Sequence, residues 1–164
     1  MSLPDTPTPL VTHLLVADSG IARLMRVVGP YKHRTIEQEE LFERASAHLH
    51  ARDLTTDLSG RTFESSGRAG TGATHTRHGV ASDYDPHQVE IERFVAHIAQ
   101  HLEARHRAGA LSNLVLMAAP HFLGVMRARL PADVKRLISH EISGDYVRAD
   151  QHQLLQLLEE AGGR

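Results

Sequence analysis

Two largely apolar runs separated by turn-forming residues near the start of the chain predict a β-hairpin. The segment VTHLLVADSGIARLMRVV (11–28) contains two β-rich runs on either side of Asp18-Ser19-Gly20. Aspartate, serine and glycine favour turns, and glycine adopts positive φ without steric cost. We expect the first strand to be the more buried of the two, because the second also carries Arg23 and Arg26.

The clearest helix is predicted over DPHQVEIERFVAHIAQHLEARHRAG (85–109). Asp85 is a suitable N-cap, Pro86 occupies the first helical position, and Gly109 ends the segment. The apolar residues fall on one stripe of this helix: Ile91, Phe94, Val95, Ile98 and Leu102. The stripe predicts that one face of the helix packs on the core.

After this helix, apolar runs alternate with helical patterns. The run NLVLMAAP (113–120) is continuously apolar, which is typical of a strand covered on both faces. The pattern then predicts a helix over 121–130, a helix over 131–139, a strand over 140–143, and a last helix over 148–163 with Asp150 as its cap. A hairpin followed by this alternation predicts a single α/β domain, with a mixed sheet of about five strands and helices on both faces.

Three other segments have less regular patterns. The segment TIEQEELFERASAHL (35–49) fits either a helix, because glutamates come early, or a third strand, and periodicity does not decide between them. Residues 50–84 form a long polar loop in this interpretation. Residues 1–10 hold three prolines and are expected to be a disordered tail, so the domain itself covers 11–164.

The polar loop contains the candidate binding residues. Loops of this length inside compact domains are usually functional or disordered. From residue 60 onward, its basic side chains are Arg61, Arg68, Arg77, His75 and His78. Because guanidinium groups and free backbone N–H groups bind phosphate, these five residues are the candidate phosphate or nucleic-acid contact. The alternative is a solvated loop without a ligand.

The start of the same loop has a different pattern. The stretch DLTTDLSGR alternates leucine with aspartate and ends in Gly60 and Arg61. Asp53 or Asp57 can pair with Arg52 or Arg61 and order the first half of the loop. Exposed pairs of this kind contribute only about 0–1 kcal/mol, so we assign them an ordering role and no catalytic one.

Composition narrows the possible classes of function. The formal net charge of −2 gives no global positive field that attracts nucleic acid, and the absence of cysteine excludes disulfides and thiolate metal sites. No apolar run is long enough to span a membrane, and the N-terminus lacks the features of a signal peptide. We therefore expect a cytoplasmic protein with no membrane insertion, no cofactor and no metal site.

Asp18 is the one candidate for a catalytic role. It lies where the first strand turns, a position at which a carboxylate can hold a divalent metal for phosphodiester cleavage. The alternative is a turn aspartate that accepts local backbone hydrogen bonds. His97 and His101 are four residues apart on the predicted helix but lack the glutamate of the zinc-protease pattern. We expect both histidines to face water.

Four segments together resemble the bacterial host-attachment protein family: VADSGIARLMRV, RDLTTDLSGRTFESSG, ERFVAHIAQHLEA and LVLMAAPHFLGVMRARL. The resemblance covers nearly the whole chain after the first ten residues. Its most specific pieces are Asp-Leu-x-x-Asp-x-x-Gly-Arg-x-Phe and APHFLGVMR. The family name refers to an attachment phenotype, so the resemblance implies no particular biochemical activity.

The order of elements is more distantly similar to the middle domain of archaeal and eukaryotic peptide-chain release factors. That resemblance implies a ribonuclease-H-like layout, and it makes EELFERAS (39–46) a third strand, which we adopt. Release factors carry Gly-Gly-Gln on the loop that corresponds to residues 60–84. This chain has no glutamine there, so no catalytic residue carries over.

Three functions are compatible with these observations. The leading expectation is a non-catalytic protein whose loop at 60–79 contacts RNA or the ribosome. The first alternative is an enzyme, either a metal-dependent phosphodiesterase that uses Asp18 or a hydrolase acting on peptidyl-tRNA. The second alternative is a protein–protein interaction module linked to attachment.

Overall fold

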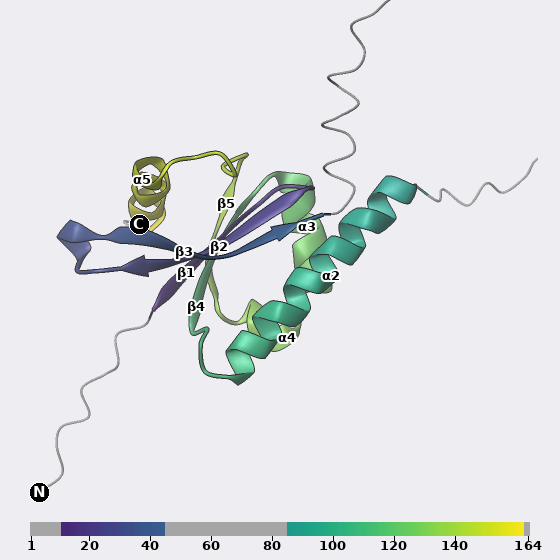
Figure 1. The fold of residues 1–164 in the computed structure, drawn as a ribbon, viewed down its shortest axis with the longest axis horizontal. Coiled ribbons are helices and arrows are strands. Elements are labelled where there is room, and N and C mark those ends of the chain that lie inside the picture. The colour runs from purple at the N-terminus through teal and green to yellow at the C-terminus, as the bar shows by residue number, and fades with distance from the viewer. Residues whose placement is uncertain (1–10, 45–84, 163–164) are drawn as a thin grey trace, which may run out of the picture.

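The structure is a computed structural model that describes residues 11–44 and 85–162. These residues form one five-stranded mixed sheet with helices on both faces (Figure 1), as predicted. The strands are β1 (Thr12–Ala17), β2 (Ile21–Val28), β3 (Thr35–Glu43), β4 (Asn113–Ala118) and β5 (Ile138–Ser143). Their order in the sheet is β3-β2-β1-β4-β5, with β2 antiparallel to both of its neighbours and β4 parallel to both of its own.

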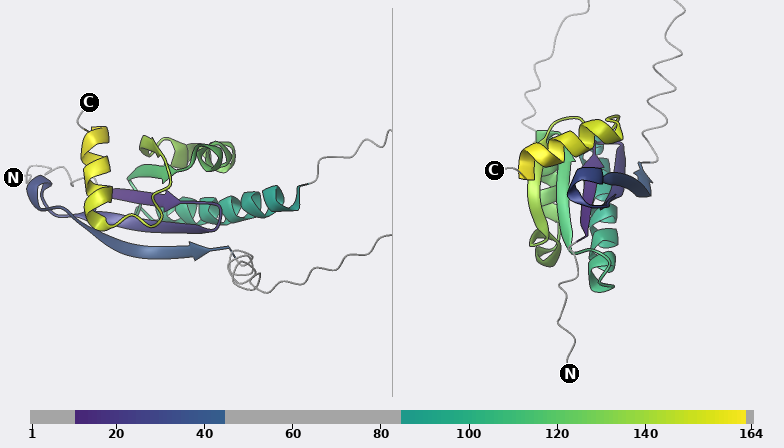
Figure 2. Two further views of the ribbon diagram at one scale, coloured as in Figure 1. Left: turned by 90° about the horizontal axis from the view of Figure 1, so that it is seen from above. Right: turned by 90° about the vertical axis from the view of Figure 1, so that its left-hand side faces the viewer.

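The helices cover the two faces unequally. The helices are α2 (Pro86–Arg107), α3 (Pro120–Arg129), α4 (Ala132–Lys135) and α5 (Gln151–Gly162), and a short 3-10 helix spans Tyr31–His33. The first three lie on one side of the sheet and α5 runs across the strands on the other (Figures 1 and 2). Among the described residues, no helix is both long and apolar enough to cross a membrane.

The helix ends follow the signals in the sequence. The Asp85 carboxylate accepts the N–H of His87 at 2.9 Å, and Pro86 follows it at the first helical position. Gly109 has a φ of 71° directly after the last turn of α2. At the start of α5, Asp150 accepts the N–H of Gln153 at 2.9 Å, and the Gln153 side chain accepts the N–H of Asp150 in return. This reciprocal pair satisfies two backbone donors at once.

The helix predicted over 131–139 is wrong in length. It ends after α4, which has four residues, Ala132–Lys135. The reason is the adjacent strand: the backbone N–H of Leu114 donates to the carbonyl oxygen of Leu137 at 2.8 Å, and Ile138 then pairs with Leu114 in register. Sheet pairing with β4 therefore overrides the helix that Pro131 and Asp133 begin.

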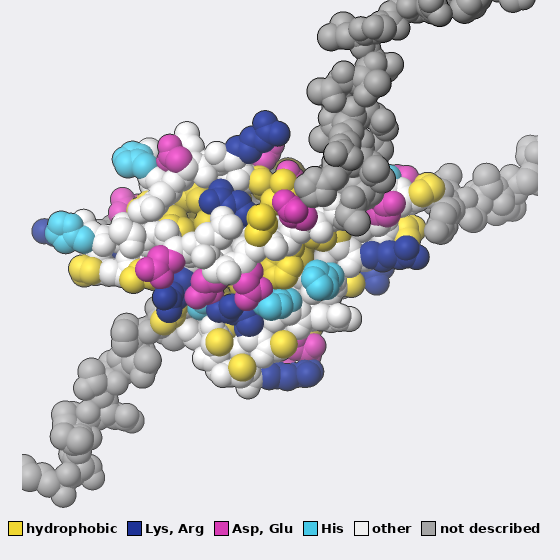
Figure 3. Space-filling view, viewed as in Figure 1, with side chains coloured by type: hydrophobic (Ala, Val, Ile, Leu, Met, Phe, Trp, Pro, Cys, Tyr) yellow, Lys and Arg dark blue, Asp and Glu magenta, His cyan; other side chains and the backbone are white. Residues whose placement is uncertain are grey.

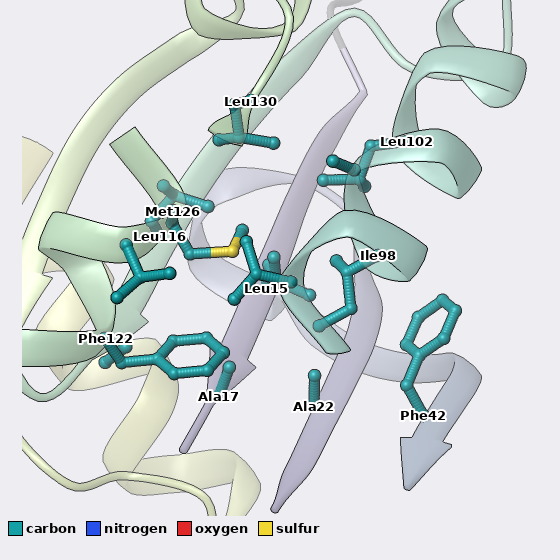
Figure 4. Close-up of a cluster of buried hydrophobic side chains, with 14 of the residues drawn as sticks. Leu15, Ala17, Ala22, Phe42, Ile98, Leu102, Leu116, Phe122, Met126 and Leu130 are labelled. Atoms are coloured by element: carbon teal, nitrogen blue, oxygen red, sulfur yellow. The ribbon is translucent and has the colours of Figure 1, made fainter. Parts of the chain in front are cut away.

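The core has two layers, one on each side of the central strands β1 and β4. One cluster joins β1 and β4 to α2 and α3, and it includes Leu15, Leu116 and the whole predicted stripe of α2 (Figure 4). The other cluster joins the opposite faces of β1 and β4 to Leu154 and Leu158 of α5. Both central strands are therefore buried on both faces, as expected for β4. Leu155 of the same helix is only half-buried.

The third strand carries a β-bulge that changes which side chains face α2. Met25 pairs with Gln38 and Leu24 with Glu40, so Glu39 is an extra residue in β3. A bulge of this kind disrupts the strict alternation of faces along a strand. Glu39, Glu40 and Phe42 consequently lie on the side of α2, whereas Gln38 lies on the side of α5.

The structure confirms the adopted third strand, although it begins at Thr35, earlier than the expected 39–46. The remaining predictions for this region concern residues outside those that the structure describes. They are the expected tail at 1–10, the end of the 35–49 segment beyond residue 44, and the polar loop up to residue 84.

One arginine joins the sheet to the segment that leads into α5. Arg23 lies half-buried on the α5 side of β2, and its Nη1 donates to the carbonyl oxygens of Val147 at 3.0 Å and Ala149 at 3.3 Å. Its Nε donates to Oε1 of Gln38 on β3 at 3.0 Å. These bonds fasten the segment between β5 and α5 to β2 and β3. They explain why β2 carries a charged residue on the face that α5 covers.

We expect Arg23→Ala to lower the free energy of unfolding by about 1–3 kcal/mol, because it leaves two carbonyl groups and an amide without their charged donor. Arg136→Ala is the matched control. Its guanidinium is exposed and, within the described part of the chain, pairs with Asp133 three residues away, so its loss should change stability by less than about 0.5 kcal/mol. Urea unfolding of both variants measures the difference, and equal losses would contradict the assignment.

Candidate functional site

The carboxyl ends of β1 and β4 meet at one edge of the sheet. Ala17 of β1 lies opposite Ala118 of β4 in parallel register. After β1 the chain turns into β2 on one side, and after β4 it enters α3 and reaches β5 on the other side. Adjacent parallel strands that lead away in opposite directions form a topological switch point, where ligands of open α/β sheets bind. This edge is the candidate functional site.

Asp18 closes the turn at this edge. Its Oδ1 accepts the backbone N–H groups of Gly20 and Ile21, both at 2.7 Å, and its own N–H donates to the carbonyl of Ile21 at 2.9 Å. This is the behaviour of a turn aspartate, the second of the two roles that the sequence allows. The carboxylate that was the catalytic candidate therefore has a structural task in the hairpin.

Carboxylates do not gather around Asp18 in the described part of the chain. Within residues 11–44 and 85–162, no group of three histidine, aspartate or glutamate side chains is placed to hold a metal ion. Asp85 caps α2, and Asp53, Asp57 and Asp83 lie outside the described residues.

Arg44 joins three elements at the same edge. Its backbone N–H donates to the carbonyl of Gly20 at 2.8 Å, which ties the end of β3 to the β1–β2 turn. Its side chain is 8% exposed, and Nη1 donates to Oε2 of Glu90 at 3.4 Å and lies 3.5 Å from Nδ1 of His87. The start of α2 is thereby held beside the end of β3. The sequence does not identify this residue, because it follows Phe42 and Glu43 with no motif around it.

The two ends of the stretch 45–84 are therefore anchored next to one another. Arg44 precedes this stretch and Asp85 follows it, and the Arg44 side chain reaches the first turn of the helix that Asp85 caps. About 40 residues lie between these two anchored points, far more than the usual connection between neighbouring elements. About a quarter of the chain thus lies between these two anchored points at the switch-point edge.

The candidate binding residues of the sequence belong to that stretch. Arg61, Arg68, Arg77, His75 and His78, and the candidate ordering residues Arg52, Asp53, Asp57 and Gly60, all lie outside the described residues.

A groove of about 680 Å³ runs between α2 and α3 from the same edge. His121 and Gln88, near the helix starts, form a hydrogen bond of 3.1 Å across it, and farther along Arg129 and Glu92 form an ion pair. Gly124 lies between them, with open space where a side chain would be. Because the charged side chains that line the groove pair with each other, they give it no net charge to attract a ligand.

The expectation that His97 and His101 both face water is wrong for His101. His97 is exposed, but His101 is half-buried, forms an ion pair with Glu40, and lies edge-on to the Phe42 ring at 5.1 Å. The cause is the bulge in β3, which turns Glu40 and Phe42 toward the helix.

Comparison with known proteins gives one match. Residues 13–158 match the model of a family described as "Protein required for attachment to host cells". No curated protein matches the chain.

The turn role of Asp18 predicts different outcomes for two substitutions. Asp18→Asn keeps an Oδ1 acceptor for Gly20 and Ile21 and should change the free energy of unfolding by less than about 0.5 kcal/mol. Asp18→Ala removes the acceptor and should cost about 1–2 kcal/mol. Thermal and urea unfolding distinguish them, and equal stability of the two variants would show that these hydrogen bonds contribute nothing.

Proposed function

The chain belongs to the family of proteins required for attachment to host cells, and from this premise we propose that it acts by binding, as a cytoplasmic module that contacts RNA or the ribosome. The contact is made by residues 60–79, through the guanidinium groups of Arg61, Arg68 and Arg77 and the imidazoles of His75 and His78. The described α/β body is the platform that carries this segment.

The observation that carries the proposal is the anchoring of both ends of the stretch 45–84. Arg44 holds the first end at the Asp18 turn and contacts the first turn of α2, which Asp85 caps at the second end. A segment much longer than its span, attached to a packed body at the edge where such sheets bind ligands, is arranged to meet something outside the body. Its arginines favour a phosphate-bearing partner, because guanidinium forks match phosphate oxygens.

A ribonuclease-H-like layout, and with it the distant relation to release-factor middle domains, is part of the proposal. The strand order β3-β2-β1-β4-β5 with an antiparallel β2 supports it. A contact made through phosphates positions a protein on RNA without reading its sequence. We therefore expect binding with little sequence preference.

A second candidate function rests on the place of Asp18 at the switch point. An enzyme that cleaves phosphodiesters or peptidyl-tRNA with a divalent metal would place a carboxylate at such an edge. This candidate predicts hydrolysis that needs Mg²⁺ or Mn²⁺ and that is lost in the variant Asp18→Asn. The variant is expected to fold normally, because it keeps the Oδ1 acceptor of the turn. Hydrolysis that is equal in the parent and in this variant removes this candidate.

The binding proposal predicts that the triple variant Arg61→Ala/Arg68→Ala/Arg77→Ala loses about tenfold or more of its affinity for single-stranded RNA at ~0.1 M salt. The slope of log K against log salt concentration should also fall, by about 0.7 for each lost phosphate contact. Filter binding over a salt series and co-sedimentation with ribosomes provide the two measurements.

A matched control removes three positive charges elsewhere on the surface. Arg107, Arg127 and Arg136 form ion pairs with Glu103, Glu141 and Asp133, and their triple alanine variant should bind RNA as the parent does. If both triple variants bind equally well, residues 60–79 are not the contact. A stable protein partner together with salt-insensitive, negligible RNA binding would instead favour the interaction-module alternative.

A further inference from the structure

Six charged or titratable side chains from four elements meet between β3 and α2. We call them the charged cluster; they are His13, Arg26, Glu39, Glu40, His101 and Arg105. Acidic, basic and histidine side chains form a band over this part of the molecule (Figure 3). The cluster lies at the other end of α2 from the switch-point edge, and neither the family nor the proposed function uses it.

Arg105 is the central donor of the cluster. Its Nη2 donates to Oε2 of Glu39 at 2.5 Å and its Nη1 to Oε1 of Glu40 at 2.7 Å. The bulge makes this possible, because it directs two consecutive carboxylates to the same side of β3. His101 pairs with Glu40 one helical turn before Arg105.

His13, on the central strand β1, lies beside the Glu39 carboxylate of the cluster. Its Nε2 lies 3.4 Å from Oε2 of Glu39, and its side chain is 3% exposed. Arg26, its register partner on β2, lies 3.5 Å from the other oxygen of Glu39 and also pairs with Glu37. The charged groups facing His13 are therefore Glu39 from β3, Arg26 from β2 and Arg105 from α2.

His13 faces two guanidinium groups, those of Arg26 and Arg105, and one carboxylate, that of Glu39. A proton on His13 therefore adds a positive charge at a buried position between two arginines. Burial lowers the pKa of His13 below its ordinary value of 6.5; Glu39 opposes this shift, and Arg105 and Arg26 reinforce it. The folded arrangement thus disfavours protonated His13.

β3 is held to α2 by little else. It is an edge strand, and its only fully buried apolar side chain is Phe42, which contacts the rings of His97 and His101. Its remaining support is the hydrogen-bonded ladder with β2, the packing of α5 on its other face, and the contacts of Arg44, directly after β3, with Glu90 and His87 of α2. Elements with few buried apolar contacts are the first to open locally.

We propose that the charged cluster is an acid-sensitive clamp: protonation of His13 releases the edge strand β3 from α2, while the central β1–β4 pair stays folded. The sign follows from linkage. An imidazole that is harder to protonate in the closed state stabilises that state fully above pH 6.5 and progressively less below it. Relative to neutral pH, protonation of one such imidazole at pH 5.0 can raise the equilibrium constant for opening by at most about 30-fold.

Hydrogen exchange measured by mass spectrometry at pH 7.5 and pH 5.0, corrected for intrinsic rates, tests the clamp. In the parent protein, exchange in the β2–β3 ladder should rise about 3- to 30-fold at the lower pH, with a smaller rise in β1 and β4. In His13→Gln, which keeps a polar donor near Glu39 but does not titrate, the rise should fall below about twofold. His97→Gln, an exposed histidine against the same Phe42, is the matched control and should respond as the parent does.

Two results would overturn the proposal. One is a parent-like response in His13→Gln, and the other is an equal rise in β1 and β4, which would mean global destabilisation rather than release of one strand. If His13→Gln does not fold, NMR titration of the parent decides. The pH midpoint of the titration of the His13 ring must then coincide with the pH midpoint of β3 opening. Two different midpoints would refute the clamp.

Discussion

The structure depends on the parallel pairing of β1 with β4, two strands that are apolar on both faces. Parallel strands cannot be joined by a tight turn, and both of their faces must be removed from water. The chain meets both demands by placing the α2 and α3 layer on one side and α5 on the other. Since the faces are occupied by packing, ligand chemistry is confined to the edges of the sheet and the grooves between helices.

The bulge at Glu39 is the second constraint, and it acts on the strand farthest from that central pair. Without an extra residue, the side chains of 36, 38, 40 and 42 would all face α5. With it, Glu40 and Phe42 move to the side of α2 and join Glu39 there. One residue thus decides both where an aromatic ring closes the core and where two carboxylates meet Arg105.

How much of this the sequence predicts depends on how local the signals are. The hairpin around Asp18, the caps Asp85 and Asp150, and the α2 stripe are all encoded within a few residues, and all were confirmed. The third strand was ambiguous by pattern because the bulge interrupts its period of two, and only the resemblance identified it. The helix at 131–139 was too long because pairing with β4 is not visible locally. Arg44 and the charged cluster were missed for the same reason, since their partners lie on elements distant in sequence.

The position of Asp18 shows why a place in a fold does not assign a function. A carboxylate at the end of β1, beside the end of β4, has the location that catalytic carboxylates of such sheets occupy. Here one of its oxygens already accepts two N–H groups at 2.7 Å, and these hydrogen bonds stabilise the turn that the residue closes. To bind a metal through that oxygen, the turn would have to give up both bonds. The place of Asp18 at this edge is therefore explained by the turn that it closes, and by itself it assigns no catalytic role.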